Sequence, residues 1–220
     1  MITNVFIIFA AITSTIALEC NPESCGGKEQ TLCKYPSPDP ASSCGEVNSA
    51  TLTQEEKDEI VKAHNDRRAL VASGEEKRGN PGPQPAGQIP PLEWSDEIAE
   101  VAQRWANQCN FGHDECRNLD QSIGQNVGLV WDPSGYNSKL TDLVESWYNE
   151  VQNFDGSKVG KFEWQETPAI GHYTQLVWGA TTQVGCGLTK YLTDNSYHTY
   201  LVCDYGPTGN FIGQPVYQTS

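Results

Sequence analysis

The sequence predicts a disulfide-bonded α+β fold, on three observations. Residues 98–109 and 140–151 repeat apolar side chains at the spacing of a helix. Residues 183–190 and 197–205 are rich in β-forming residues and flank a short polar turn, which is typical of a hairpin. Eight cysteines, an even number, follow an apolar N-terminal stretch, which indicates disulfides formed in an oxidising compartment.

Residues 1–17 predict a secretory signal peptide. The segment lacks charged side chains, residues 2–12 are largely apolar, and Thr15 and Ala17 are small enough for a cleavage site. No later segment is long and apolar enough to span a bilayer, so we expect a protein without a transmembrane anchor. The roughly two hundred remaining residues suit one domain. A net charge of -14 disfavours nucleic acid and anionic membranes as partners.

Residues 18–52 predict an irregular N-terminal arm that disulfides pin to the main body. Four cysteines stand here among proline, serine and glycine, without a helical or strand period. An independent disulfide-knotted module is the alternative, and it would leave Cys109 and Cys116 to pair only with each other.

The first long helix is expected to begin after Thr53, because Thr53 and Glu56 fit a capping box, and Gly74 can end it. His64 falls within its apolar face. We interpret His64, with Asn65 and Arg68, as core hydrogen-bonding residues, because buried polar groups must be paired. The prolines and glycines of residues 78–91 then predict a surface connection.

A second helix follows Ser95, a favourable N-cap, and a third covers 140–151. Glu150 lies roughly ninety degrees from the centre of the third helix's apolar face, which places it at the edge of the core. Residues 121–131 between these helices suggest a loop that enters a short strand.

Residues 171–178, GHYTQLVW, alternate in a way that predicts a strand, with His172 entering it just after a glycine. In the hairpin that follows, a turn centred between Asp194 and Asn195 sets position 186 opposite position 203. We therefore predict a disulfide between Cys186 and Cys203.

Two histidines and one carboxylate are candidates for chemistry. His113 stands in a short segment between two cysteines, His172 follows a glycine, and Glu150 lies at the edge of the core. Each histidine alone is more typical of a structural role, but together the three would suffice for a divalent metal such as zinc with an open position. The sequence lacks HExxH, a glycine-rich phosphate loop and GxSxG, and all eight cysteines can pair, so no nucleophile is visible.

Several stretches resemble the signature motifs of the CAP superfamily, which includes cysteine-rich secretory, antigen 5 and pathogenesis-related proteins. They are GHYTQLVW with the Ala180-Thr181-Thr182 run, YLVCDYGPTGNF at 200–211, HNDRR at 64–68, GQNVG at 124–128 and WYNEVQNF at 147–154. RGNPGPQP, WANQC and GHDEC further resemble the antigen 5 group of insect venom allergens, so the resemblance covers nearly the whole chain after the signal peptide.

This resemblance implies an α-β-α sandwich over residues 53–220, with a three-stranded, mainly antiparallel sheet between helical layers. It implies a central cleft lined by His113, Gln125, Glu150 and His172. Gln125 stands where many relatives have glutamate, and a neutral amide weakens the case for calcium and for a catalytic carboxylate pair. The resemblance also implies four disulfides: Cys20–Cys33, Cys25–Cys116, Cys44–Cys109 and Cys186–Cys203.

The function that the resemblance implies is that of a secreted, extracellular, non-enzymatic venom or salivary protein, a monomer and allergen that binds a small lipid. It would require no cofactor, although a zinc-like ion at His113 and His172 is compatible with it. One alternative is an effector that binds host proteins, such as a receptor or protease. With either function, antibodies are expected as further partners. A second alternative is a metal-dependent hydrolase using His113, Glu150 and His172, against which Gln125 and the missing nucleophile count.

Overall fold

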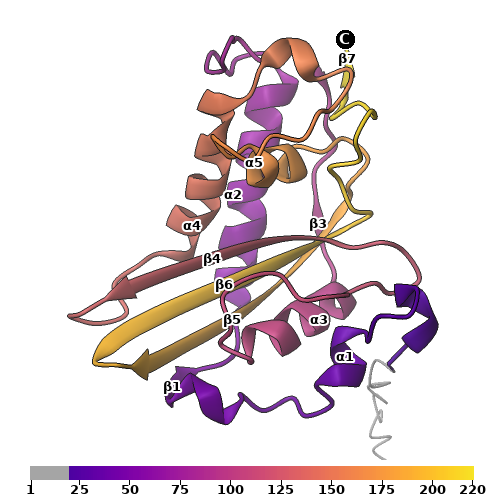
Figure 1. The fold of residues 1–220 in the computed structure, drawn as a ribbon. Coiled ribbons are helices and arrows are strands. Elements are labelled where there is room, and N and C mark those ends of the chain that lie inside the picture. Colours follow the sequence, from indigo (N-terminus) through magenta and orange to yellow (C-terminus); the bar gives the residue numbers. More distant parts are fainter. Residues whose placement is uncertain (1–19) are drawn as a thin grey trace, which may run out of the picture.

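The computed structural model describes residues 20–220, and the predicted signal peptide lies outside the described residues. Three long strands form a sheet with helices on both faces (Figure 1), which confirms the α+β sandwich. The strands are β4 (Gly124–Asp132), β5 (Gln183–Thr193) and β6 (Ser196–Gly206). One layer holds α2 (Gln54–Ala72), α4 (Leu140–Tyr148) and α5 (Gly171–Leu176), and the other holds α3 (Asp96–Ala106) and the N-terminal arm. Within residues 20–220, no helix has the length and apolarity needed to cross a membrane.

The sheet has two more strands than the three expected. Its order is β1-β5-β6-β4, and β3 (Glu93–Trp94) adds a short parallel pair to β5. Strand β1 (Glu46–Ser49) comes from the arm, and its few residues leave no readable period in the sequence. The short strand expected near residue 131 is a full nine-residue strand, β4. A separate pair joins β2 (Gly87–Gln88) to β7 (Gln218–Thr219).

The β5–β6 hairpin has the predicted register. Cys186 lies opposite Cys203, and a disulfide joins them. Helix α3 packs closely on β5 because two glycines leave room for its backbone. A Cβ atom at Gly185 would lie 2.2 Å from the Ala99 nitrogen, and one at Gly187 would lie 2.2 Å from the Gln103 Cα. The lack of a side chain at these two glycines of β5 thus allows the close packing of α3 on the sheet.

The prediction of a strand at residues 171–178 is wrong, because residues Gly171–Leu176 form helix α5. Residues 173–178 are all buried, so their apparent alternation does not separate a core face from a solvent face. The Glu150 carboxylate accepts hydrogen bonds from the backbone amides of His172 and Tyr173, which satisfies two of the first amides of this helix. A carboxylate from a distant part of the chain therefore supports a helix that the local pattern does not indicate.

The long helices begin as the sequence predicts. Thr53 and Glu56 form the capping box of α2, and the Ser95 side chain caps α3. The third predicted helix is shorter than expected, because α4 ends at Tyr148 and continues as the 3₁₀ segment η3 (Asn149–Asn153). Glu150 therefore lies on η3.

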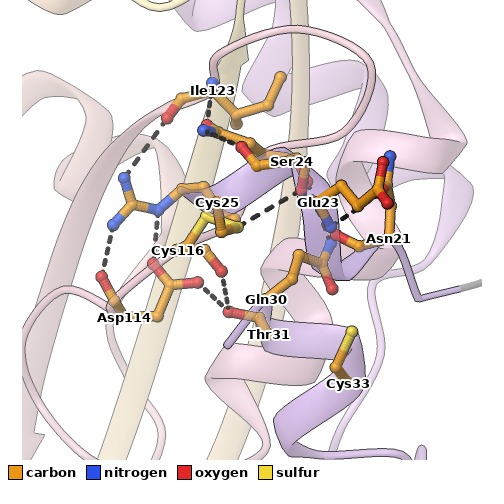
Figure 2. Close-up of a disulfide and its surroundings, with 12 residues drawn as sticks. Asn21, Glu23, Ser24, Cys25, Gln30, Thr31, Cys33, Asp114, Cys116 and Ile123 are labelled. Atoms are coloured by element: carbon orange, nitrogen blue, oxygen red, sulfur yellow. Dashed lines mark hydrogen bonds and ion pairs between the residues drawn. A yellow bond between two sulfur atoms is a disulfide. The ribbon is translucent and has the colours of Figure 1, made fainter. Parts of the chain in front are cut away.

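The N-terminal arm contains more structure than its composition indicates. It holds η1 (Pro22–Cys25), α1 (Thr31–Lys34), η2 (Ser42–Cys44) and strand β1. The four disulfides are those that the resemblance implies. Two of them join the arm to the segment that carries His113: Cys25–Cys116 (Figure 2) and Cys44–Cys109. The arm is thus part of the main body and not an independent module.

Candidate functional site

A cavity of about 180 Å³ lies where β4, α5 and the His113 segment meet. His113, Gln125 and His172 line it, and Glu150 lies behind His172 and holds its ring. The structure thus gathers the four residues of the predicted cleft, three at its wall and one beneath it. The remaining lining residues were not among the candidates: Asn126, Trp164, Gln165, Glu166, Ala169, Gly171 and Asn210.

His172 is fixed from two sides. Its Nδ1 atom lies 2.6 Å from Glu150 Oε1, and its ring stacks on the Trp147 indole with 6.2 Å between centroids and 16° between planes. The side chain of His172 is 31% exposed, against 14% for Glu150. The imidazole therefore presents its other edge, with Nε2, away from the core.

Glu150 serves the backbone as well as the imidazole. Its Oε2 atom accepts from the amide of His172 at 2.8 Å and from that of Tyr173 at 3.2 Å. One carboxylate therefore starts helix α5 and orients the histidine that the helix carries.

Replacing Glu150 by glutamine should destabilise this corner. The new NH₂ group would face either the two backbone amides or the donating Nδ1–H of His172, so at least one buried donor loses its acceptor, at a cost of about 1–3 kcal/mol. We expect faster hydrogen exchange at the His172 and Tyr173 amides together with a lower free energy of unfolding. Glu145→Gln is the matched control, because Glu145 is more exposed and pairs with Arg67 at the surface. Equal effects of the two substitutions would contradict this role of Glu150.

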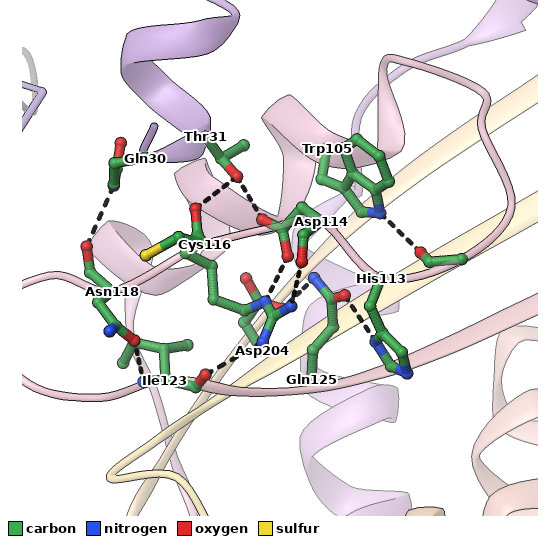
Figure 3. A network of polar contacts seen from close by, with 12 residues as sticks. Gln30, Thr31, Trp105, His113, Asp114, Cys116, Asn118, Ile123, Gln125 and Asp204 are labelled. Carbon is green, nitrogen blue, oxygen red and sulfur yellow. Dashed lines mark hydrogen bonds and ion pairs between the residues drawn. The ribbon is translucent and has the colours of Figure 1, made fainter. Parts of the chain in front are cut away.

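His113 belongs to a second chain of hydrogen bonds (Figure 3). Its Nδ1 atom lies 2.9 Å from Gln125 Oε1, and Gln125 Nε2 donates to Asp204 Oδ1 at 2.9 Å. Because Asp204 takes the NH₂ group, Gln125 turns its oxygen to His113, whose Nδ1 must then carry the proton. The resemblance draws attention to Gln125, but only the structure shows that Asp204, a buried residue on β6, orients it.

The charges around His113 favour a neutral ring. Partial burial is the largest effect and lowers the pKa of His113, and the positive charge of Arg117 lowers it further, whereas the hydrogen bond to Gln125 and the Asp114 carboxylate oppose this. Asp204 is fully buried, and burial together with the nearby Asp114 carboxylate raises its pKa well above the usual range. A protonated Asp204 still keeps one oxygen that accepts from Gln125, so the orientation of the amide does not depend on that proton.

The arm holds the His113 segment in place. The Thr31 hydroxyl contacts the Asp114 carboxylate and lies 2.9 Å from the Cys116 carbonyl oxygen, while Arg117 pairs with the same carboxylate (Figures 2 and 3). The Cys25–Cys116 disulfide closes the same region. The segment of His113 is therefore fixed by contacts with a distant part of the chain, since Thr31 and Asp114 are 83 residues apart in the sequence.

His64 lies outside the site, as its interpretation as a core residue predicts. It is fully buried, with Nδ1 2.8 Å from the Ile60 carbonyl oxygen and Nε2 2.8 Å from the Tyr205 hydroxyl. Asn126 connects this buried group to the cleft, since its Nδ2 donates to the Tyr205 hydroxyl and to the His172 carbonyl oxygen. The buried network thus supports the cleft from below.

The two histidines match part of a zinc site. Each has its Nδ1 occupied by a protein oxygen, which is the usual outer contact of a metal-bound histidine, and neither Nε2 has a hydrogen-bond partner among the described residues. Yet no group of three His, Cys, Asp or Glu side chains in residues 20–220 is placed to hold a metal ion. The residues therefore fit two positions of a tetrahedral ion and leave the others to water or a ligand.

The chain is similar to known proteins over most of its length. Residues 61–205 match the model of the cysteine-rich secretory protein family, CAP. The chain is 45% identical to venom allergen 5 of Brachyponera chinensis, over 88% of this chain and 99% of that protein. It is 44% identical to venom allergen 5 of Microctonus hyperodae, over 97% of this chain and 95% of that protein.

Solved structures agree with these relatives. BmVAL-1 has a TM-score of 0.68 and 30% identity, over 80% of this chain and 87% of that one. The structure of NaASP2 with Zn²⁺ has a TM-score of 0.67 and 25% identity, over 80% of this chain and 91% of that one. The family match covers more than half of the chain, and the two venom allergen 5 relatives are 45% and 44% identical to it over most of its length. This chain belongs to the cysteine-rich secretory protein (CAP) family and is of the venom allergen type.

Proposed function

We propose that this chain is a secreted, non-enzymatic binding protein of venom or saliva, and that its cleft holds a small ligand or ion through Nε2 of His113 and of His172. The observation that carries this proposal is the pair of imidazoles in one cavity, each with Nδ1 held by a protein oxygen. The venom allergen relatives support the type of protein, and the disulfides fit an extracellular environment.

The chemistry of the cleft argues against a hydrolase. No serine, threonine or cysteine is among the residues that line the cavity, and all eight cysteines are in disulfides. Glu150 is close to His172 but already accepts three N–H groups, so it has little capacity left to serve as a general base. Gln125 cannot replace it, because an amide does not take up a proton near neutral pH.

A zinc-like ion is the simplest occupant of the two nitrogens. His113 and His172 would hold it, and Gln125 and Glu150 would keep both rings oriented through Nδ1. Such an ion would supply a positive charge and open coordination positions for a ligand. NaASP2, whose structure was determined with Zn²⁺, gives a precedent within the same fold.

A larger groove of about 880 Å³ lies elsewhere, between α2 and α4. Seven of its nine lining side chains are charged: Glu59, Lys62, Asp66, Arg67, Lys139, Asp142 and Glu145. An acyl chain placed there would remove these charges from water, which is costly. This lining favours a polar or charged partner over a lipid between these helices.

Calorimetry with Zn²⁺ on chelator-treated protein tests the proposal. We expect one ion per chain, and no binding in the His113→Ala, His172→Ala double variant. His198→Ala is the matched control, because His198 lies on β6 opposite Trp131 and does not line the cavity. Unchanged zinc binding in the double variant would show that His113 and His172 do not hold the ion. The same samples should not hydrolyse generic peptides or esters, and turnover that His172→Ala abolishes would refute the non-enzymatic part.

A further inference from the structure

We propose that the two-histidine cleft selects the ammonium group of an organic cation, which it would hold with the Trp164 indole, the Glu166 carboxylate and the Nε2 atoms of the histidines. This inference rests on the proposed function, because it uses the same two nitrogens. It adds a ligand class, a small amine or a lysine side chain, and two residues that no motif indicates.

The first argument is the inventory of donors and acceptors. The four side-chain amides that line the cavity all donate to protein atoms. Gln125 donates to Asp204, Asn126 to the His172 carbonyl oxygen and the Tyr205 hydroxyl, Gln165 to the Pro168 carbonyl oxygen, and Asn210 to the Gly171 carbonyl oxygen. With Nδ1 of both imidazoles also donating inward, the titratable side chains of the lining offer a ligand acceptors: two imidazole nitrogens and one carboxylate. A donor-only headgroup such as an ammonium matches this set.

The second argument is charge. The cavity lining contains no lysine or arginine, and its one carboxylate, Glu166, has no ion-pair partner among the residues that the structure describes. The protein as a whole carries a net charge of -14, so its field attracts cations toward the surface. An anionic ligand would meet the Glu166 carboxylate and no lysine or arginine in this lining.

The third argument is the exposed indole. Trp164 is 56% exposed although it is a large apolar side chain. It packs edge-on against the buried Phe162 ring, with centroids 6.3 Å apart, and its far edge lies over Gly171, where an added Cβ would be 2.9 Å from the indole. The ring is therefore held at the cavity wall and remains accessible. The face of a tryptophan is the side-chain surface that attracts an ammonium group most strongly.

The size of the cavity limits the ligand. A volume of about 180 Å³ accepts an ammonium with a short alkyl chain, and not a large lipid. A free small amine and the lysine side chain of a partner protein share this headgroup. The chemistry of the site therefore defines the group, and a comparison of ligands must separate its two sources.

The test compares n-butylammonium with n-butanol, its neutral analogue, on chelator-treated protein by calorimetry and by the imidazole C–H shifts of His113 and His172. We expect butylammonium to bind at millimolar concentrations, and butanol about tenfold more weakly or not at all. Trp164→Leu and Glu166→Gln should each weaken butylammonium several-fold, whereas Trp164→Tyr should retain most of the affinity. Trp131→Leu is the matched control, because Trp131 is also an exposed tryptophan, at 64%, but lies outside the cavity.

Equal affinity for butylammonium and butanol, no binding of butylammonium, or no effect of Trp164→Leu would each overturn the inference. N-acetyl-lysine amide separates the sources: binding at least as tight as that of butylammonium supports a lysine of a partner protein, and weaker binding supports a free amine. Zinc binding without ammonium binding would refute this inference alone. Ammonium binding without zinc binding would refute only the ion as occupant in the proposed function.

Discussion

Arg68→Met is expected to lower the free energy of unfolding by about 4 kcal/mol or more, because it leaves several buried carbonyl groups without a donor. The Arg68 side chain is fully buried and donates to four backbone carbonyl oxygens. They belong to Pro90, Leu176, Trp178 and Thr181. The guanidinium thus joins α2 to the connection before β3 and to the segment that follows α5. Burial lowers its pKa to about 9, so it stays charged at neutral pH.

The neighbouring Arg67→Met serves as the control in denaturant titrations with the disulfides intact. Arg67 is partly exposed and forms a surface pair with Glu145, so its loss should cost at most about 1 kcal/mol. Arg68→Lys should fall between the two, because an ammonium cannot reach all four carbonyl oxygens in the planar geometry of a guanidinium. Similar losses for Arg67→Met and Arg68→Met would show that the four carbonyl contacts contribute little.

His64 is expected to make the protein acid-sensitive in a defined range. Burial is the largest effect on its ring and lowers its pKa from 6.5 to about 4; the positive charge of Arg68 adds to this, and the hydrogen bond with the Ile60 carbonyl opposes it. An unfolded chain binds a proton at His64 below pH 6.5 whereas the folded chain does not. The contribution of the neutral ring is therefore fully present above pH 6.5 and is lost as the pH falls to 4, which amounts to about 3 kcal/mol at about 1.4 kcal/mol per pH unit.

The difference in stability between the protein and its His64→Gln variant, measured from pH 7 to pH 4, isolates this effect from that of other titrating groups. We expect the difference to shrink by about 3 kcal/mol over that range, because glutamine does not titrate. Glu76 affects stability only at lower pH. Burial by itself would raise the pKa of Glu76, but the hydrogen bonds from Arg78 and Tyr148 outweigh the effect of burial and lower the pKa to about 2. Its contribution is therefore lost only below about pH 4.3, its unfolded pKa. Stability curves of protein and variant that run parallel from pH 7 to pH 4 would refute the assignment to His64.

The helices and the hairpin were predictable because their signals are local. Thr53 and Ser95 cap helices from their own side chains, and the β5–β6 register follows from the turn at Asp194 and Asn195. The interpretation of His64 as a core residue followed from its place on the apolar face of the predicted helix, and the structure confirms that His64 and Arg68 are both buried. For the cleft, the residues alone indicated two histidines and Glu150, and the resemblance added Gln125.

The sequence by itself determined the α+β class, the starts of the long helices, the final hairpin and its disulfide, because each depends on contacts between residues close in the chain. The tertiary structure decided that residues 171–176 form a helix, because the carboxylate that accepts its first amides is Glu150, more than twenty residues away. It also decided the orientation of Gln125 through Asp204 and brought Trp164 to the cleft wall. Such contacts join segments that are far apart in the chain, so the local sequence pattern of either segment does not predict them.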